Sequence, residues 1–226
     1  MKTLIKFLSC VILMLYCSCE KDAMSDGEIS DFDLTYEKMK PDRSTVDVFN
    51  PILGEVVGSA TLLRNEKGFS YTYKSNALTP GYAYTVWLVV WNNPQECAIP
   101  GACIDTDFAR ADLTQVEVMT GTGHVVGSSG KGYFGGHLNV GDDSGTINDL
   151  FGLPYAGGLQ QGKTFSSEIH LVLRSHGPAR PGMISDQIGS YEGGCDNPFE
   201  FPPFTEIPDE MGECGDIEVA IFSPVN

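Results

Sequence analysis

One short segment carries most of the side chains that could do chemistry, EIHLVLRSH at positions 168–176. If this segment is a β-strand, successive side chains alternate between its two faces. One face carries Ile169, Leu171 and Leu173 and would pack into a core. The other face is polar and has both signs of charge, so we expect it to meet solvent, a cleft or a partner. It contains Glu168, His170, Val172, Arg174 and His176.

Basic side chains cluster at the end of this segment and just after it, and we call Arg174, His176 and Arg180 the basic island. The loop GPARPG at 177–182 is stiff and would hold Arg180 near Arg174 and His176. The whole chain has a formal net charge of −16, so clustered basic groups stand out. Guanidinium groups suit carboxylate, phosphate and sulfate. These three residues are therefore a candidate subsite for an anion or a sugar acid, and a solvated strand face with cross-strand ion pairs is the alternative.

The histidines suggest a second kind of site. His124, His137 and His170, together with Glu168, offer nitrogen and oxygen ligands that suit zinc or copper. Such a site requires their strands to be neighbours, because the chain has neither an HxH nor an HExxH motif. The alternative is that each histidine is a hydrogen-bonded structural residue.

The elements that must position these residues are mostly strands. A hairpin is predicted at 56–64 and 69–74 around the turn NEKG, and YAYTVWLVVW at 82–91 predicts a central strand covered on both faces. Further strands are expected at 116–126, 132–140, 165–175 and 217–222, with short helical turns at 106–113 and 183–191. This pattern predicts an all-β domain over 31–226, an antiparallel β-sandwich or barrel with long loops.

Four cysteines of the mature chain form an even set. Cys97 and Cys103 would close a small loop directly after the central strand, and Cys195 and Cys214 would clamp the proline-rich segment between them. Sequence allows three pairings of four cysteines, and proximity favours this one. Zinc binding is the competing use of such residues, but the spacing contains no CxxC pair.

The N-terminus predicts export. Residues 1–18 read as a signal peptide, with Lys2 and Lys6 before an apolar run that is too short to span a bilayer as a stable helix. The stretch LYCSC resembles the lipobox of bacterial lipoproteins, which implies that Cys19 receives the lipid. Cysteine parity favours the same acceptor, because of seven cysteines two leave with the leader and four can pair. An ordinary signal peptide that releases a soluble protein is the alternative.

The segment 19–30 indicates where the protein is anchored. It resembles the acidic tether that follows the lipidated cysteine in lipoproteins carried to the surface of some Gram-negative bacteria. We therefore expect a protein anchored by acyl chains such as palmitate in the outer membrane and facing outward. The periplasmic face is the alternative.

The charge composition of the chain argues against nucleic acid as a binding partner. Thirty acidic residues stand against fourteen basic ones, and an acidic surface repels the phosphates of nucleic acid. We expect no cofactor. The expected partners are the membrane, through the lipid, and a glycan or another envelope component such as a protein.

The mature chain resembles known proteins in two ways. The succession YTVWLVVWNNPQEC, TGTGHVVGSSGKGYFGGHLNVGD, EIHLVLRSHGPARPG and SYEGGC is similar to a set of exported bacterial proteins of uncharacterised activity, over about residues 78–195. The stretch GSATLLRNEKGFSYTYKSNALTPGYAYTVWLV resembles the opening strands of chordin-like and superoxide-dismutase-like β-sandwiches. The paired histidine motif that those families place after this strand is missing, which argues against a dismutase-type copper site.

Two functions remain in view. The first is an envelope lipoprotein that binds a partner, and the second is a metal-binding protein or metal-dependent enzyme that uses the histidines. Whether the protein is an enzyme stays open.

Overall fold

The computed structural model describes residues 40–197 and 207–225. The predicted signal peptide 1–18, Cys19 and the tether 19–30 lie outside the described residues. The described residues all belong to one compact unit, Lys38–Asn226. No helix among them has the length and apolar character needed to cross a membrane.

The described chain is mostly β-structure, as the alternation predicted. The strands are β1 (Asp42–Asn50), β2 (Glu55–Asn65), β3 (Gly68–Ser75), β4 (Tyr82–Trp91), β5 (Val116–Val125), β6 (Gly132–Asn139), β7 (Glu168–Pro178) and β8 (Gly215–Phe222). The helices are short: η1 (Pro94–Glu96), η2 (Asp105–Arg110), α1 (Ala111–Thr114), η3 (Asn148–Phe151) and α2 (Ile184–Gly189).

The strand predictions differ from the structure mainly at one element. β1 was not predicted, because its side chains are largely polar and only Val48 and Asn50 are fully buried. β7 starts at Glu168, three residues after the predicted start. The predicted hairpin forms as β2 and β3, with Asn65 opposite Gly68.

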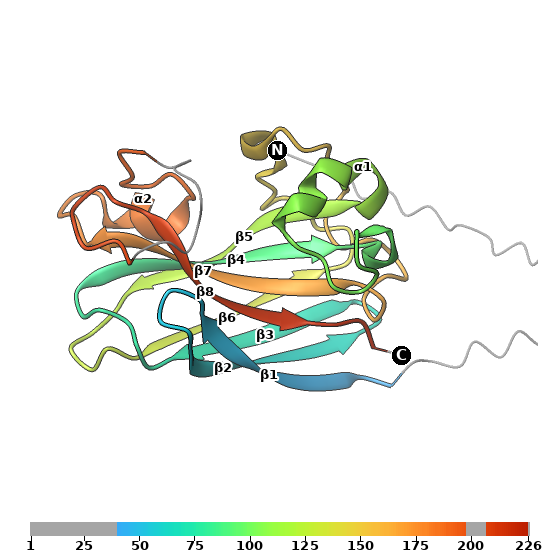
Figure 1. The fold of residues 1–226 in the computed structure, drawn as a ribbon, viewed down its shortest axis with the longest axis horizontal. Helices are drawn as coiled ribbons and strands as arrows, with labels where there is room; N and C mark the ends of the chain where they lie inside the picture. Colours follow the sequence, from blue (N-terminus) through green and yellow to red (C-terminus); the bar gives the residue numbers. More distant parts are fainter. Residues whose placement is uncertain (1–39, 198–206, 226) are drawn as a thin grey trace, which may run out of the picture. The chain divides into compact units, whose positions relative to one another are not determined.

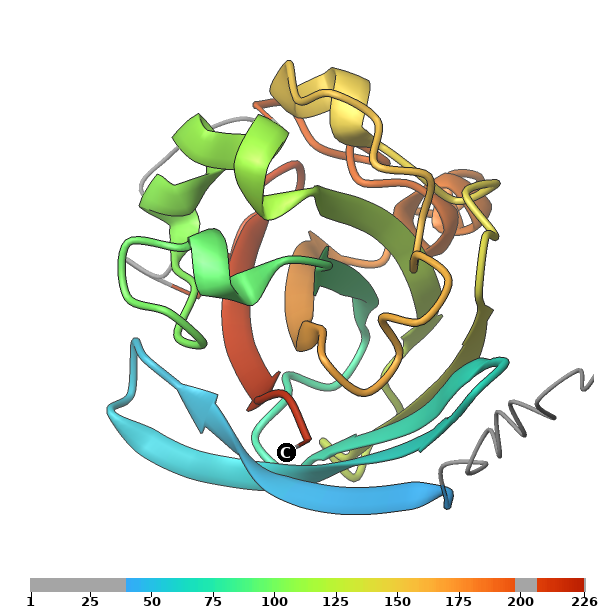
Figure 2. The same cartoon turned by 90° about the vertical axis from the view of Figure 1, so that its right-hand side faces the viewer.

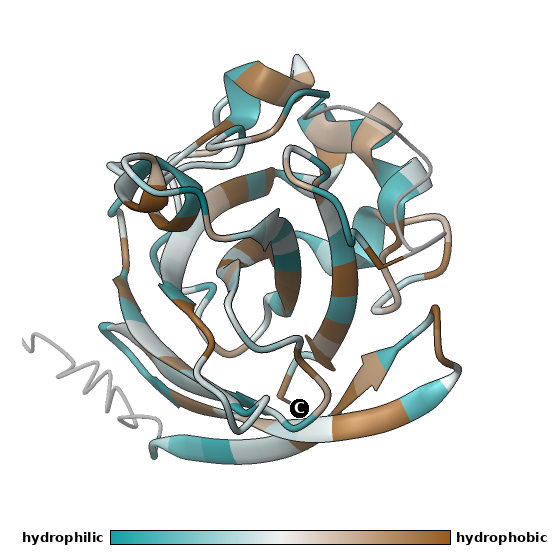
Figure 3. Ribbon diagram, turned by 90° about the vertical axis from the view of Figure 1, so that its left-hand side faces the viewer, coloured by the Kyte–Doolittle hydropathy of each residue, from teal (hydrophilic) through white to brown (hydrophobic). Residues whose placement is uncertain are grey.

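The sheet curls into a nearly closed barrel, which decides between the sandwich and barrel alternatives (Figure 2). Within the described residues it has eight strands in the order β5-β4-β7-β8-β1-β2-β3-β6, and every neighbouring pair is antiparallel. The barrel interior is filled by alternate side chains of these strands, such as Tyr84, Val86, Leu88 and Val90 of β4. Figure 3 shows the resulting alternation of apolar and polar positions along the strands.

The barrel is completed between its two end strands, β5 and β6, by a loop and by close packing. The amide of Thr120 donates to the Gly145 carbonyl at 2.8 Å, and the amide of Ile147 donates to the Val118 carbonyl at 2.9 Å. At Gly121 and at Gly136 an added Cβ would come within 2.7 and 2.6 Å of the Tyr71 hydroxyl. Glycine is needed at both positions because any side chain would collide with this tyrosine.

One side of the barrel carries a second layer. Helices α1 and α2 lie over β4, β5 and β7, whereas the outer side of β1, β2 and β3 has no helix over it (Figure 1). A second apolar cluster fills the space beneath this layer, and it includes Val89, Trp91, Val116 and Val118. β4 is therefore buried on both faces, as its continuous apolar run predicted.

Candidate functional site

The polar face of β7 lies on the outside of the barrel, beneath the second layer. The residues of this face lie beside the outward residues of the neighbouring strand β4, since Val89 pairs with His170 and Thr85 with Arg174. Two disulfides sit at its two ends. Cys97–Cys103 lies near Glu168, and Cys195–Cys214 lies near His176, so the predicted cysteine pairing is confirmed.

A carboxylate and a histidine form a buried pair at the first end. The Oε1 atom of Glu168 lies 2.7 Å from the Nε2 atom of His170, and it also accepts the Cys103 amide at 2.9 Å. Glu168 is fully buried and His170 is 7% exposed. The tautomer that fits this contact has its proton on Nε2, donated to the carboxylate, and leaves Nδ1 as an acceptor.

Aromatic rings form the wall beside this pair. Trp91 stacks on Phe108 with ring centroids 5.2 Å apart and planes 16° from parallel. The His170 ring lies 6.1 Å from Trp91. Asp107 holds the segment that carries Phe108, because its carboxylate accepts the amides of Ala98 and Ile104 at 2.7 and 3.0 Å. The wall is thus fixed to the disulfide loop rather than to the barrel alone.

A small pocket of about 160 Å³ opens above His170. Its only acidic side chain is Asp105, which is exposed, and its other walls are apolar or aromatic apart from the histidine. Ile104 and Ile221 are both about half exposed, at 53% and 45%. The lining residues are Val89, Trp91, Cys103, Ile104, Asp105, Phe108, His170, Val172, Val219 and Ile221.

This arrangement can hold a ring-sized group and offer it hydrogen-bond acceptors. A cavity of roughly 150 Å³ is large enough for benzene. His170 Nδ1 and the Asp105 carboxylate can both accept a hydrogen bond, and neither lysine nor arginine is among the residues that line the pocket. A histidine oriented by a carboxylate can also take a proton from a bound group.

Arg174 lies at the middle of β7 and is paired inside the protein. Its Nη1 atom lies 3.1 Å from the Oδ1 atom of Asp216 on β8, and its guanidinium carbon lies 3.9 Å from the centre of the Tyr191 ring. The Tyr191 ring in turn meets Trp87 edge-on, at 5.0 Å between centroids. Arg174 is only 3% exposed, so it is packed between the barrel and the second layer.

His176 is fully buried at the far end of β7. Its Nε2 atom lies 2.8 Å from the Thr85 hydroxyl, and its Nδ1 atom lies 2.9 Å from the Gly193 carbonyl. Burial, and to a lesser extent the Arg174 charge, lowers the pKa of His176 to about 3. The ring is therefore neutral at physiological pH.

The expected exposed basic island is not present in this form. Arg174 and His176 are buried and have partners inside the protein, and only Arg180 of the three is partly exposed. The Nη1 atom of Arg180 donates to the Gly194 carbonyl at 2.9 Å and lies 3.5 Å from the Asp196 carboxylate. Tyr191 and Gly193, which cover these residues, lie in the segment that follows α2 and not in β7 itself, so alternation along β7 could not reveal them.

The four residues of the predicted metal site do not come together. His137 lies on the outer face of β6 between Ser70 and Asn139, at 2.9 and 2.8 Å. His124 is opposite Tyr84 of the barrel core and stacks on Phe134, and burial lowers its pKa. Among the described residues, no three ligand atoms from this set lie within 4.8 Å of one another. Only Glu168 and His170 are in contact, because the other two histidines are on other strands and face different ways.

Sequence reasoning missed the aromatic wall and Asp105. Trp87 and Trp91 share one face of β4, and that spacing was a usable signal for an aromatic patch outside the barrel. The residues of η2 gave no such signal, because their contact with β7 depends on the path of the disulfide loop. No protein-family model matches this chain, and comparisons with curated proteins and with solved structures found no similar chain.

Proposed function

We propose that this protein is an exported, lipid-anchored binding protein of the bacterial envelope, and that it binds a small ligand in the pocket above His170. The anchor is supported by the leader and by the LYCSC stretch that places Cys19 at its end. The two disulfides of the described domain suit an oxidising compartment.

One observation carries the binding proposal: a carboxylate fixes the imidazole of His170 at a pocket with aromatic walls. The Glu168 pair and the Cys103 amide are buried, so the orientation of the ring is set before any ligand arrives. Preorganisation of this kind reduces the entropy lost on binding. Small-ligand sites in proteins combine apolar walls with a few fixed polar groups in the same way.

The pocket chemistry defines the ligand class. His170 Nδ1 and Asp105 are acceptors, so the ligand should bring a hydrogen-bond donor or a positive charge. The apolar walls favour a ring or a short hydrocarbon. We therefore place neutral or cationic cyclic groups that carry a hydroxyl or an amine ahead of the anionic ligands that the basic island suggested. A glycan unit would bind here only through its hydroxyl donors.

Titration calorimetry with four probes tests the proposal on the purified mature chain. Tyramine carries a phenol and an ammonium group, phloretate replaces that ammonium with a carboxylate, and phenol and methyl glucoside test the ring and the sugar separately. Tyramine should bind more tightly than phloretate, and phenol should bind weakly. If phloretate or methyl glucoside binds and tyramine does not, the proposed ligand class is wrong.

Matched variants locate the binding. His170→Phe keeps a ring but removes the acceptor, and Asp105→Asn removes the charge at an exposed position. Both should weaken tyramine binding by about tenfold, the loss expected for one hydrogen bond to a charged or polar partner. His137→Phe is the control, since His137 is exposed on another strand. Equal tyramine affinity in His170→Phe and in the parent would remove the pocket from the proposal.

The anchor is tested separately. Labelled palmitate should be incorporated by the parent chain expressed in a Gram-negative host and lost in Cys19→Ala. Incorporation that persists in Cys19→Ala would contradict the assigned acceptor, whatever the result at the pocket.

A further inference from the structure

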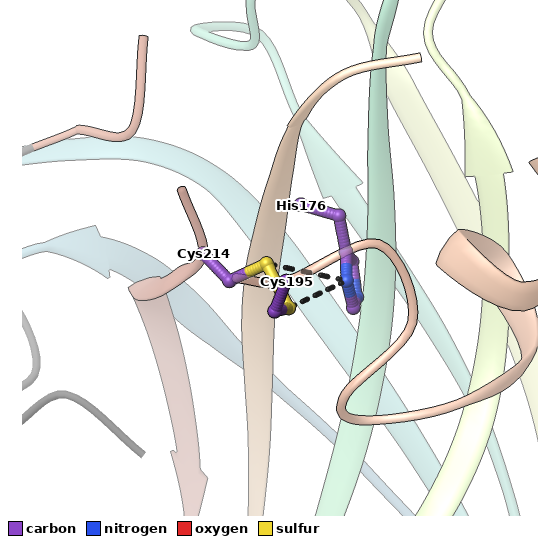
Figure 4. A group of neighbouring side chains, drawn as sticks. All are labelled: His176, Cys195 and Cys214. Atoms are coloured by element: carbon purple, nitrogen blue, oxygen red, sulfur yellow. Dashed lines mark hydrogen bonds between the residues drawn. A yellow bond between two sulfur atoms is a disulfide. The ribbon is translucent and has the colours of Figure 1, made fainter. Parts of the chain in front are cut away.

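A histidine lies against the second disulfide. The Nδ1 atom of His176 is 3.6 Å from the sulfur of Cys195 and 3.8 Å from the sulfur of Cys214 (Figure 4). Within the described ranges, these three residues are the only group of three or more histidine, cysteine and acidic side chains whose ligand atoms lie within 4.8 Å of one another.

The spacing of these atoms is that of ligands around one metal ion. Zinc binds a thiolate sulfur at about 2.3 Å and an imidazole nitrogen at about 2.0–2.1 Å in tetrahedral geometry. Two such ligands are then about 3.6 Å apart, from those bond lengths and the tetrahedral angle. Both nitrogen-to-sulfur distances are already close to this value. Only the two sulfurs, which are now bonded to each other, would have to separate.

We propose that reduction of the Cys195–Cys214 disulfide converts this cluster into a binding site for a thiophilic metal ion such as Zn²⁺. A dithiol reductant gives two protons and two electrons to the disulfide, which becomes two thiols while the reductant becomes a disulfide. Zn²⁺ then displaces one proton from each thiol and binds two thiolates and the imidazole nitrogen, so two protons are released. The two thiolate charges neutralise the charge of the Zn²⁺ ion, so the metal and its two sulfur ligands together carry no net charge.

The surroundings of His176 suit a metal ligand. The ring is fully buried, and burial favours the neutral form, which ligates. Its Nε2 atom lies 2.8 Å from the Thr85 hydroxyl, which can accept a hydrogen bond from the Nε2 proton when Nδ1 is bound to metal. In the disulfide form Nδ1 instead donates to the Gly193 carbonyl, so metal binding replaces that hydrogen bond. The nearby positive charge of Arg174 is paired with Asp216.

The site leaves one position open. Three protein ligands account for three of the four positions that zinc prefers, and both cysteines are partly exposed, so water can take the fourth. Nitrogen and sulfur ligands favour zinc and copper(I) over magnesium or calcium. The pocket at His170 plays no part in this site, so the two proposals can fail separately.

The test compares oxidised and reduced protein. The mature chain is reduced with a phosphine, which is then removed without air, and Zn²⁺ is titrated against a chromophoric chelator. We expect about one Zn²⁺ per reduced chain and none per oxidised chain. Co²⁺ added to the reduced chain should give the thiolate-to-metal absorption of a tetrahedral site. Reduced protein with titratable thiols that binds neither ion overturns the proposal.

Variants assign the ligands. Reduction also opens Cys97–Cys103, so a Cys97→Ala, Cys103→Ala chain should keep the zinc site, whereas Cys195→Ala, Cys214→Ala should lose it. Thr85→Val preserves shape and should weaken zinc binding by about 10–100-fold, the effect of removing a partner of a metal-bound histidine. Zinc binding that survives in the Cys195, Cys214 variant, or that is unchanged in Thr85→Val, overturns the assignment. The cobalt spectrum of the parent keeps the test valid if a variant does not fold.

Discussion

The imidazole of His170 and the carboxylate of Glu168 lie 2.7 Å apart on the outer face of β7, two positions from each other along the strand. Same-face neighbours of a strand are about 6.6 Å apart along its axis, so a side-chain bond between them needs both groups to lean together. The Cys103 amide supplies the additional partner that keeps Glu168 in this place. The orientation of His170 therefore depends on the disulfide loop as well as on its own strand.

Replacing Glu168 with Gln tests this dependence. The amide has the same shape but no charge, and it cannot satisfy His170 and Cys103 equally well. We expect the free energy of unfolding to fall by roughly 1–3 kcal/mol and tyramine affinity to fall as in His170→Phe. Denaturant titration and calorimetry measure the two effects. Unchanged stability together with unchanged affinity would show that the carboxylate does not position the ring.

Arg64 closes one end of the barrel, and its loss should be severe. Its guanidinium donates to carbonyls of the segment before β7 and of the end of β8 and the residue after it, at Thr164, Phe165, Ser167, Phe222 and Ser223. Arg64→Met leaves these carbonyls without their donor, and we expect a loss of roughly 3–5 kcal/mol in denaturant unfolding. Arg43→Met, on the exposed face of β1, should change stability by no more than about 0.5 kcal/mol. Equal stability of the two variants would contradict the assigned role.

Glu218 should make the barrel less stable as the pH rises. Burial raises its pKa to about 7, although Ser75 and Tyr73 donate hydrogen bonds to it. Between the ordinary value of 4.5 and about 7 the folded chain holds a proton that the unfolded chain has lost. The contribution of this group to stability is therefore fully present at low pH, and it falls by roughly 1.4 kcal/mol per pH unit across that window.

Glu218→Gln should remove this pH dependence. Unfolding free energies at pH 5 and pH 8 would be compared in the parent, in Glu218→Gln and in the exposed control Glu55→Gln. We expect the parent and the control to lose stability at the higher pH relative to Glu218→Gln. The prediction is wrong if all three chains show the same difference between the two pH values.

Much of the fold follows from local patterns, and its exceptions have physical reasons. Turn residues between apolar runs predicted the hairpin of β2 and β3, a continuous apolar run predicted the buried β4, and proximity in sequence predicted both disulfides. β1 escaped prediction because its less exposed positions are themselves largely polar, with Asp42, Ser44 and Asn50 beside two valines, so the strand has little apolar periodicity. Whether the sheet forms a barrel or a sandwich depends on which strands pair. No local sequence pattern shows that β7 lies between β4 and β8.

The site was predictable only in part. Alternation correctly set Glu168 and His170 on a polar face of β7, yet it could not show that Arg174 and His176 of the same face are buried. Tyr191 and Gly193 cover them, and the sequence does not show that the segment after β7 folds back over this face. Arg174 is paired with Asp216 of β8, and the sequence does not show that β8 lies beside β7. Exposure in this protein is thus set by loops that only the three-dimensional structure places.

Ligand binding in the proposed pocket brings a donor against Nδ1 of His170. A nitrogen NMR spectrum of the chain labelled in its histidine rings, recorded during a tyramine titration, detects this contact at the atom itself. The Nδ1 signal of His170 should shift and saturate with tyramine, while the ring signals of His137 stay in place. A saturating shift at His137 alone, or no shift at His170 at concentrations where calorimetry detects binding, would contradict the proposed contact.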